Sequence, residues 1–241
     1  MKYLPTLTAI VAAAFFVTAA SAQSAKFAAF YEADTVTLAE FEIGIDGETF
    51  AEELLTTIRA PKHKEFLIGV SGVANIVTFT EARGRNKAGM STAVAEGIMN
   101  LEVRYAPTGT AGICDSGLIA APGALTFASR RQELAVTVDL DVIDTDLDDG
   151  DLAATLDIIG SVTVALGLDT TAAHHFSFVA IDLPTSGEYD VVACFSGDGA
   201  VSVTEAEAGD NHARSFVAIA HRMITVQEVR AVKDSIIDLV N

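Results

Sequence analysis

Residues 133–143 read Glu-Leu-Ala-Val-Thr-Val-Asp-Leu-Asp-Val-Ile, in which apolar and polar side chains alternate almost one for one. Leu134 and Val136 fall on one side of an extended chain, and Thr137 and Asp139 fall on the other. A strand turns successive side chains to opposite faces. The stretch therefore predicts a β-strand with one buried and one solvated face.

The same alternation recurs along most of the chain. Seven further runs show it: residues 66–80, 92–105, 124–131, 161–168, 175–183, 188–196 and 215–229. Residues 83–89 and 184–187 separate such runs and have the composition of hairpin connections. Strands with turns of this kind between them favour antiparallel sheets over βαβ units. We therefore expect an all-β fold, an antiparallel β-sandwich of about eight strands.

Two segments fit the strand pattern less well. Thr49 and Glu52 match a helix capping box, but residues 56–58 are β-branched neighbours and favour a strand over 54–59. The C-terminal residues Val229, Val232, Ile236 and Val240 are spaced like one face of a helix. We expect a strand at the first segment and a short helix at the second.

Residues 1–22 have the layout of a signal peptide. A lysine at position 2 precedes an apolar run, and an Ala-Ser-Ala sequence ends at Ala22. A membrane anchor is the alternative, but a spanning helix needs about 20 apolar residues and this run is shorter. We expect cleavage between Ala22 and Gln23. The mature chain, residues 23–241, would then be a single exported domain that is not inserted in a membrane.

The composition is strongly acidic. The chain has 33 Asp and Glu against 15 Lys and Arg, a net charge of −18, and 50% apolar residues. Such a charge repels polyanions, which argues against nucleic acid and anionic lipid as partners and favours divalent cations and basic surfaces. The more general explanation is a surface that like charges keep soluble. The apolar half of the composition is enough for one sizeable core.

Cys114 and Cys194 are the only cysteines. An exported chain meets oxidising conditions, so we expect the two to form a disulfide. The alternative is two separate buried thiols, because a free cysteine packs like a small apolar residue. Neither cysteine has a companion histidine at a recognisable spacing, so we assign no catalytic role to either sulfur.

An acidic run is the densest group of oxygen ligands in the chain. Its candidate metal ligands are Asp144, Asp146, Asp148, Asp149 and Asp151. Ca²⁺ takes six to eight oxygens in flexible geometry, so a turn of this composition can bind it. Asp149 and Thr155 stand where an EF-hand loop starting at Asp144 needs Gly and Glu, so the run is not an EF-hand. The alternatives are a Ca²⁺-binding tip of another geometry and a solvated turn.

The longest irregular stretch, residues 106–123, is a candidate for a hydrolytic site. It contains Asp115-Ser116-Gly117, the local signature of an aspartic protease, but such an enzyme needs two aspartates and the motif occurs once. Asp-Ser-Gly is also ordinary turn chemistry. A secreted hydrolase with Asp115 as its acid is therefore the alternative function, and no catalytic constellation is evident from the sequence.

Histidines and a basic loop complete the candidates. On an alternating strand, one of His174 and His175 faces inward and the other outward, so we expect a core histidine and a solvent histidine in place of a metal pair. Residues 83–87 form the one local positive segment. That loop could contact the acidic run of a second copy, or it could be a solvated turn.

Three segments resemble sequence found in a group of secreted, β-rich proteins with no assigned activity. They are Ala-Leu-Thr-Phe-Ala-Ser-Arg-Arg-Gln at 124–132, Ala-Ala-His-His-Phe-Ser-Phe-Val at 172–179, and Thr-Val-Gln-Glu-Val-Arg at 225–230. The resemblance implies a single exported β domain and supplies no site. From the residues we expect a secreted binding or structural protein that associates with itself or with a matrix or cell-surface component. It needs no cofactor, with Ca²⁺ as the one candidate ion.

Overall fold

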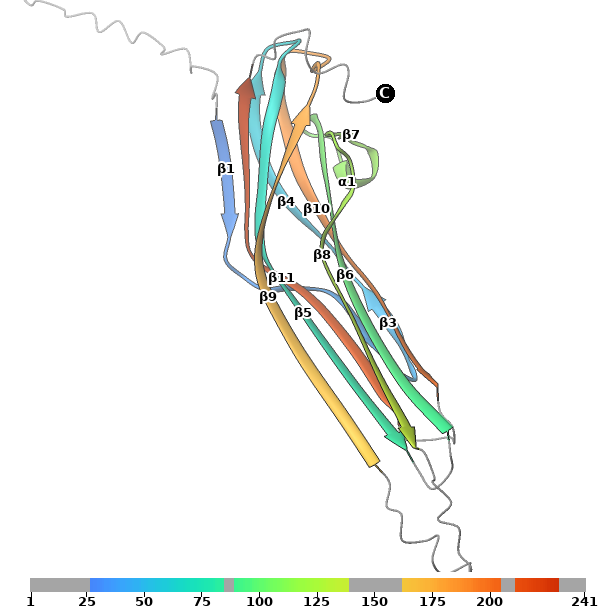
Figure 1. Ribbon diagram of the computed structural model, residues 1–241. Coiled ribbons are helices and arrows are strands. Elements are labelled where there is room, and N and C mark those ends of the chain that lie inside the picture. Colours follow the sequence, from blue (N-terminus) through green and yellow to red (C-terminus); the bar gives the residue numbers. More distant parts are fainter. Residues whose placement is uncertain (1–26, 85–88, 139–161, 205–210, 230–241) are drawn as a thin grey trace, which may run out of the picture.

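The protein is an elongated β-sandwich (Figure 1). The computed structural model describes residues 27–84, 89–138, 162–204 and 211–229. In these residues two antiparallel sheets pack face to face, and the one helix is a single turn. The fold class expected from the alternation is therefore confirmed, although the described residues form eleven strands where about eight were expected.

The first sheet has six strands, in the order β3-β2-β11-β5-β9, and β1 pairs with a later stretch of β11 than β2 does. Its strands are β1 (Phe27–Glu32), β2 (Val36–Glu42), β3 (Ile45–Thr49), β5 (Glu65–Gly84), β9 (Val162–Ala180) and β11 (His212–Val229). β9 pairs with β5 along its whole length without a register shift, from Val162 opposite Gly84 to Ala180 opposite Phe66. β9 therefore forms one edge of this sheet.

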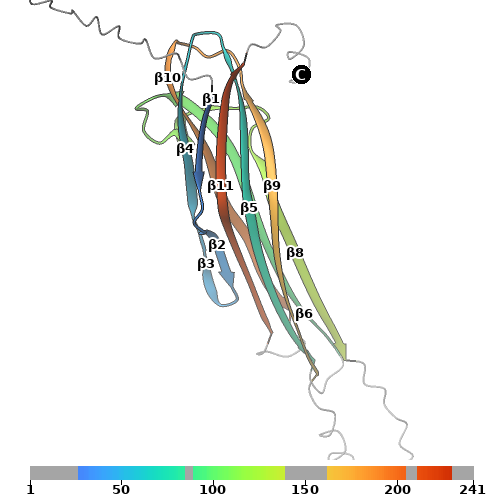
Figure 2. The ribbon, with the colours of Figure 1, turned by 90° about the vertical axis from the view of Figure 1, so that its left-hand side faces the viewer.

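The second sheet has five strands, in the order β4-β10-β6-β7, and β8 also pairs with β6. Its strands are β4 (Ala51–Ala60), β6 (Gly89–Pro107), β7 (Leu118–Ile119), β8 (Leu125–Val138) and β10 (Gly187–Thr204), and the helical turn α1 (Ile113–Ser116) precedes β7. Figure 2 shows β8 and β9 at one rim of the sandwich, with β1, β3 and β4 at the other.

Several expected elements have different boundaries in the structure. The runs at 124–131 and 133–143 were expected to be two strands, but β8 joins the first to the described part of the second. The runs at 161–168 and 175–183 likewise form the single strand β9, because a strand at a sheet edge can continue without a fully apolar face. The strand expected at 54–59 is confirmed as β4, and β1 to β3 were not expected.

The two turns expected to be hairpin connections join different sheets. Residues 83–89 link β5 in the first sheet to β6 in the second, and residues 184–187 link β9 in the first sheet to β10 in the second. The hairpin interpretation was wrong because turn composition specifies a reversal of the chain but not the sheet that the next strand joins. These connections make the two sheets interleave in sequence, so neither sheet is a separate domain.

The core lies between the sheets and is largest toward the end that carries α1. Its largest members are Phe66, Phe127, Phe178, Tyr189, Phe195, Leu38, Leu54 and Ile58, all almost completely buried. The rings of Phe66 and Tyr189 meet edge to face with centroids 5.9 Å apart. Burial of each such side chain contributes about 1.5–3 kcal/mol to stability. This part of the sandwich is therefore the rigid frame for the surface features below.

Three expectations lie outside the described residues. They are the signal peptide over 1–22, the acidic run of Asp144, Asp146, Asp148, Asp149 and Asp151, and the short C-terminal helix beyond Val229. Each stays a prediction from the sequence.

Candidate functional site

The outer edge of β9 is the main candidate for an interaction site. In the described part of the chain, β9 pairs with β5 on one side, and its other side meets a single bridge at Ala121. The strand has 19 residues, contains no Lys, Arg or Pro, and has Asp169 as its one acidic residue. Soluble proteins usually protect such edges with charge, proline or short length. β9 has none of these protections along most of its length.

The direction of the free main-chain groups on β9 follows from that bridge. The N–H of Ala121 donates to the carbonyl of Val179, and the N–H of Val179 donates to the carbonyl of Ala121, both at 2.9 Å. Both polar groups of Val179 therefore point away from β5, and every second residue of the strand shares this orientation. The residues that present N–H and C=O at the edge are Thr163, Ala165, Gly167, Asp169, Thr171, Ala173, His175 and Ser177.

The first half of β9 also overhangs the second sheet. Phe178 is buried and faces the core, but the inward-facing row becomes more exposed toward the start of the strand, where Leu166 is 40% and Val164 is 39% exposed. The start of the strand projects at the lower end of the molecule (Figure 1). Over the residues that the structure describes, the side of the sandwich between β8 and β9 is therefore only partly covered, and apolar residues lie on the inner face of the overhang.

A polar clamp holds the overhang in place. The amide of Gln132, on β8, donates to the hydroxyl of Thr80 at 2.8 Å and to the carbonyl of Leu166 at 2.7 Å. The hydroxyl of Thr78 donates to the other end of the same amide at 2.6 Å. Gln132 is buried, so these bonds form in a poorly solvated environment where losing one is costly. The clamp fixes β8 to β5 and β9 without covering the edge.

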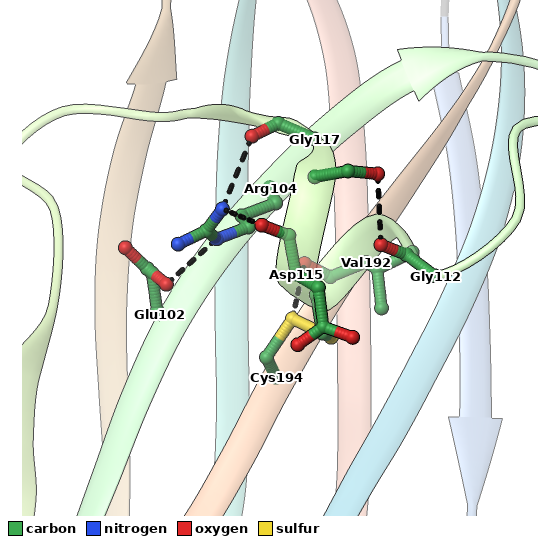
Figure 3. The surroundings of a disulfide bond; sticks show 9 residues. Glu102, Arg104, Gly112, Asp115, Gly117, Val192 and Cys194 are labelled. Atoms are coloured by element: carbon green, nitrogen blue, oxygen red, sulfur yellow. Dashed lines mark hydrogen bonds and ion pairs between the residues drawn. A yellow bond between two sulfur atoms is a disulfide. The ribbon is translucent and has the colours of Figure 1, made fainter.

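Cys114 and Cys194 form the expected disulfide, with Cα atoms 5.8 Å apart. The bond ties α1 to the outward face of β10 (Figure 3). Arg104 donates to the main-chain carbonyls of Asp115 and Gly117 at 3.1 and 3.3 Å, and pairs with Glu102 at 2.7 Å. The loop over 106–123 is therefore held by a covalent bond and by an arginine, and its position is fixed.

A cleft of about 280 Å³ opens beside this disulfide on the outer face of the second sheet. Its lining includes both cysteines, Glu53, Glu102 and Asp115. The carboxylate of Asp115 is exposed. Arg104 donates to the main-chain carbonyl of Asp115 and not to its carboxylate (Figure 3).

The hydroxyl of Ser116, next to Asp115, bonds only to main-chain carbonyls among the described residues. Ser116 Oγ donates to Gly112 O at 3.0 Å and lies 3.4 Å from Ala111 O. These contacts stabilise the helical turn and do not place a base beside the hydroxyl. In the described residues, the loop therefore offers a cleft and a carboxylate but no activated nucleophile.

Arg222 is a buried charge that the sequence patterns did not reveal. Its side chain is fully buried at 0% exposure, and it pairs with Glu32 and Asp34 at 2.8 Å each and with Glu52. Burial works against its charge, but the hydrogen bonds to Glu52 and Asp34 outweigh burial and raise the pKa of Arg222 above its usual value. The arginine therefore joins β11 to β1, to the β1–β2 connection and to β4.

The histidine pair lies as expected. His174 faces inward and is half-buried, with its ring 5.3 Å from that of Phe127 and 6.4 Å from that of Phe176. His175 is exposed on the opposite face of β9. Over the described ranges, no group of three or more His, Cys, Asp or Glu side chains could hold a metal ion.

The basic loop is described only at its start. Arg83 pairs with Glu81 at 3.0 Å, and residues 85–88 lie outside the described residues. Contact between this loop and the acidic run of another copy therefore stays a prediction.

No known protein family matches the chain, and a search of curated proteins finds no relative. Among the described residues, none of the helical structure is long and apolar enough to cross a bilayer. The functional argument therefore depends on the geometry of the edge and of the disulfide-bound loop.

Proposed function

We propose that the chain is an exported structural or binding protein of the cell exterior, which acts by adding the edge of β9 to a strand of another copy or of an extracellular partner. The observation that carries the proposal is the 19-residue edge of β9, with its row of outward N–H and C=O groups. Addition of a strand to such an edge gives affinity through main-chain hydrogen bonds.

Other features of the chain support an extracellular role. The disulfide between Cys114 and Cys194 suits an oxidising compartment, where such bonds form and persist. The leader expected over residues 1–22 would deliver the chain there. A sandwich of strands up to 20 residues long is also a rigid, extended unit, which suits a structural role.

The test compares the mass of the mature chain with that of a variant whose edge carries a charge. Ala173→Lys places a lysine on the exposed edge, and Gln227→Lys places one on the exposed face of the interior strand β11 as a matched control. Light scattering after size exclusion should show association of the wild type and of Gln227→Lys, and loss of association in Ala173→Lys. A wild type that stays monomeric up to about 200 μM, a concentration at which weak contacts form, would contradict self-association.

The acidic run adds a cation-dependent form of the same proposal. If Asp144, Asp146, Asp148, Asp149 and Asp151 bind Ca²⁺, the ion removes repulsion between carboxylates at a contact. The mass should then shift between Ca²⁺ and a chelator in the wild type but not when all five are replaced by Asn. An equal mass in the two buffers would remove the role of Ca²⁺ and leave the edge contact intact.

The alternative, a secreted hydrolase at the 106–123 loop, is distinguished by the effect of replacing Asp115. The carboxylate of Asp115 is exposed, so Asp115→Ala should leave both association and thermal stability unchanged if the protein is structural. Loss of a measured peptidase or glycosidase activity in Asp115→Ala would favour the hydrolase.

A further inference from the structure

We infer that the partner of the β9 edge is β9 of a second copy, paired antiparallel about a two-fold axis at Ala172. This inference rests on the proposed function and names the partner and register of the same edge. A two-fold contact is self-complementary, because each residue that one copy presents meets the same surface on the other. The positions and charges of the strand select this register.

The outward hydrogen-bonding groups restrict the possible registers. They belong to the odd-numbered residues of β9, so two copies can exchange main-chain bonds only if odd residues lie opposite odd residues. The bridge between Ala121 and Val179 closes the upper end of the edge, because both groups of Val179 are already bonded. The axis must therefore lie at a residue of β9 below that bridge.

Charge then separates the remaining registers. With the axis at Ala172, Asp169 lies opposite His175 of the second copy, and the pair occurs twice. With the axis one residue earlier or later, Asp169 meets Ala173 or Ser177, and every other axis sets it against an uncharged residue of β9, against itself, or against a position outside the strand. Opposite charges on facing strands stabilise a pair and like charges destabilise it. Only the axis at Ala172 sets the single carboxylate against a basic side chain.

The surroundings of His175 leave it available for this contact. Ser71 of β5 lies opposite His175, and Gly69 lies under its ring, where an added Cβ would be 2.9 Å from His175 Cε1. The next strand, β11, contributes Thr225 beside Gly69. None of these three neighbours is charged, so Asp169 of the second copy would be the charged group that faces the imidazole.

The inner face of β9 agrees with the same axis. The even-numbered residues of β9 face inward. With this axis, Leu168 lies opposite Phe176 of the second copy, and the two Ala172 residues lie opposite each other. Leu168 and Phe176 are both half-buried in the single chain, so pairing removes more of their apolar surface from water. Val164 and Leu166 are 39% and 40% exposed, so the start of this row is also apolar surface that the single chain leaves partly in water.

The test is a disulfide across the axis. Facing residues of an antiparallel pair have Cα atoms within the range that a disulfide spans, and residues displaced by two positions do not. Ala172→Cys should therefore form a covalent dimer under mild oxidation, seen on a non-reducing gel. Ala173→Cys, the adjacent alanine and matched control, should stay monomeric because it faces Thr171 of the second copy.

The outcomes separate this inference from the proposed function. Two results would overturn the β9 register while the structural role stands. One is a cross-link in Ala173→Cys but not in Ala172→Cys. The other is no cross-link in either variant although the wild type associates. A wild type that is monomeric at every concentration would overturn both.

A proline scan checks the edge by a second route. The N–H of Thr171 points away from β5, so Thr171→Pro removes no bond of the β5 ladder and should fold but fail to dimerise. The N–H of Thr170 points into the ladder, so Thr170→Pro should lower the unfolding temperature. Wild-type association of a folded Thr171→Pro would contradict the edge contact.

Discussion

Arg222 is the residue whose loss should harm the fold most. It is fully buried against Glu32, Asp34 and Glu52, so Arg222→Ala would leave three carboxylates without their cation. Breaking a buried ion pair from one side typically costs about 3–5 kcal/mol. Glu32, Asp34 and Glu52 are 35%, 66% and 26% exposed, so they regain part of their hydration when the arginine is removed. We therefore expect a loss near the lower end of that range in the free energy of unfolding, measured by guanidinium denaturation of the purified variant.

Arg131 provides the control for that measurement. Its side chain is 58% exposed, and it pairs with Glu133 at 3.0 Å on the surface of β8. Exposed pairs contribute about 0–1 kcal/mol, so Arg131→Ala should change stability little. If Arg222→Ala cost no more than Arg131→Ala, the buried arginine would not be the junction that its contacts indicate.

Gly197 of β10 lies where the second sheet packs tightly against β2 of the first. A Cβ there would lie 2.4 Å from the carbonyl oxygen of Leu38, which is main chain and cannot turn aside. Gly197→Ala should therefore destabilise the protein by about 1–3 kcal/mol through overpacking. Gly187, where nothing lies within 4 Å of an added Cβ, is the matched control and should tolerate alanine. Equal melting temperatures for the two variants would contradict this.

At the scale of the elements, the disulfide should be the strongest single constraint. It closes a loop of 80 residues between α1 and β10, and the chain-entropy account assigns such a loop up to about 4.5 kcal/mol. Replacing Cys114 and Cys194 together by Ala should lower the denaturation midpoint, and wild type in a reducing agent should match the double variant. An unchanged midpoint in both would show that the loop is held without the bond.

β9 also shows which part of the fold the sequence could predict. Alternation revealed its two ends, at 161–168 and 175–183, but not the stretch around Asp169 that joins them. Alternation reports a face that must be buried. The inward row of β9 is partly exposed, so the pattern fades at the edge strand that carries the candidate site.

Arg222 escaped the sequence for a related reason. A charged residue in a strand is normally read as pointing to water, and its three carboxylate partners lie more than 150 residues away in the chain. The disulfide was predictable because the chain has two cysteines and its first 22 residues predict export to an oxidising compartment. The ion pairs of Arg222 join residues far apart in the chain, so no pattern in the sequence around Arg222 indicated them.

For the whole molecule, charge should govern association through salt. The chain carries a net charge of −18, so two copies repel, while β9 itself has one carboxylate. The screening length falls from about 10 Å at 0.1 M salt to about 3 Å at 1 M. We expect the dissociation constant of the dimer to fall several-fold over that range, measured by analytical ultracentrifugation.

The control for the salt series is the melting temperature of the monomeric Ala173→Lys variant in the same buffers, which reports the effect of salt on folding alone. A dissociation constant that rises with salt would mean that attractive pairs such as Asp169 and His175 outweigh the repulsion of the whole chain.

The order of the strands in the two sheets was also beyond the sequence. Alternation located the strands that flank 83–89 and 184–187, and the composition of these two segments indicated that the chain reverses there. Whether a reversed strand returns to its own sheet or crosses to the other depends on which surfaces pack, and each strand has the same alternating pattern in either case.

The bond between Cys114 and Cys194 has a mechanical consequence. If the molecule is pulled at its two ends, the segment from Cys114 to Cys194, a sequence separation of 80, bears no tension and adds no length. At about 3.5 Å for each extended residue, the bond withholds roughly 280 Å of reach. Under a stretching force, the chain outside the two cysteines would therefore unfold and extend first. Further extension would require reduction of the Cys114–Cys194 bond.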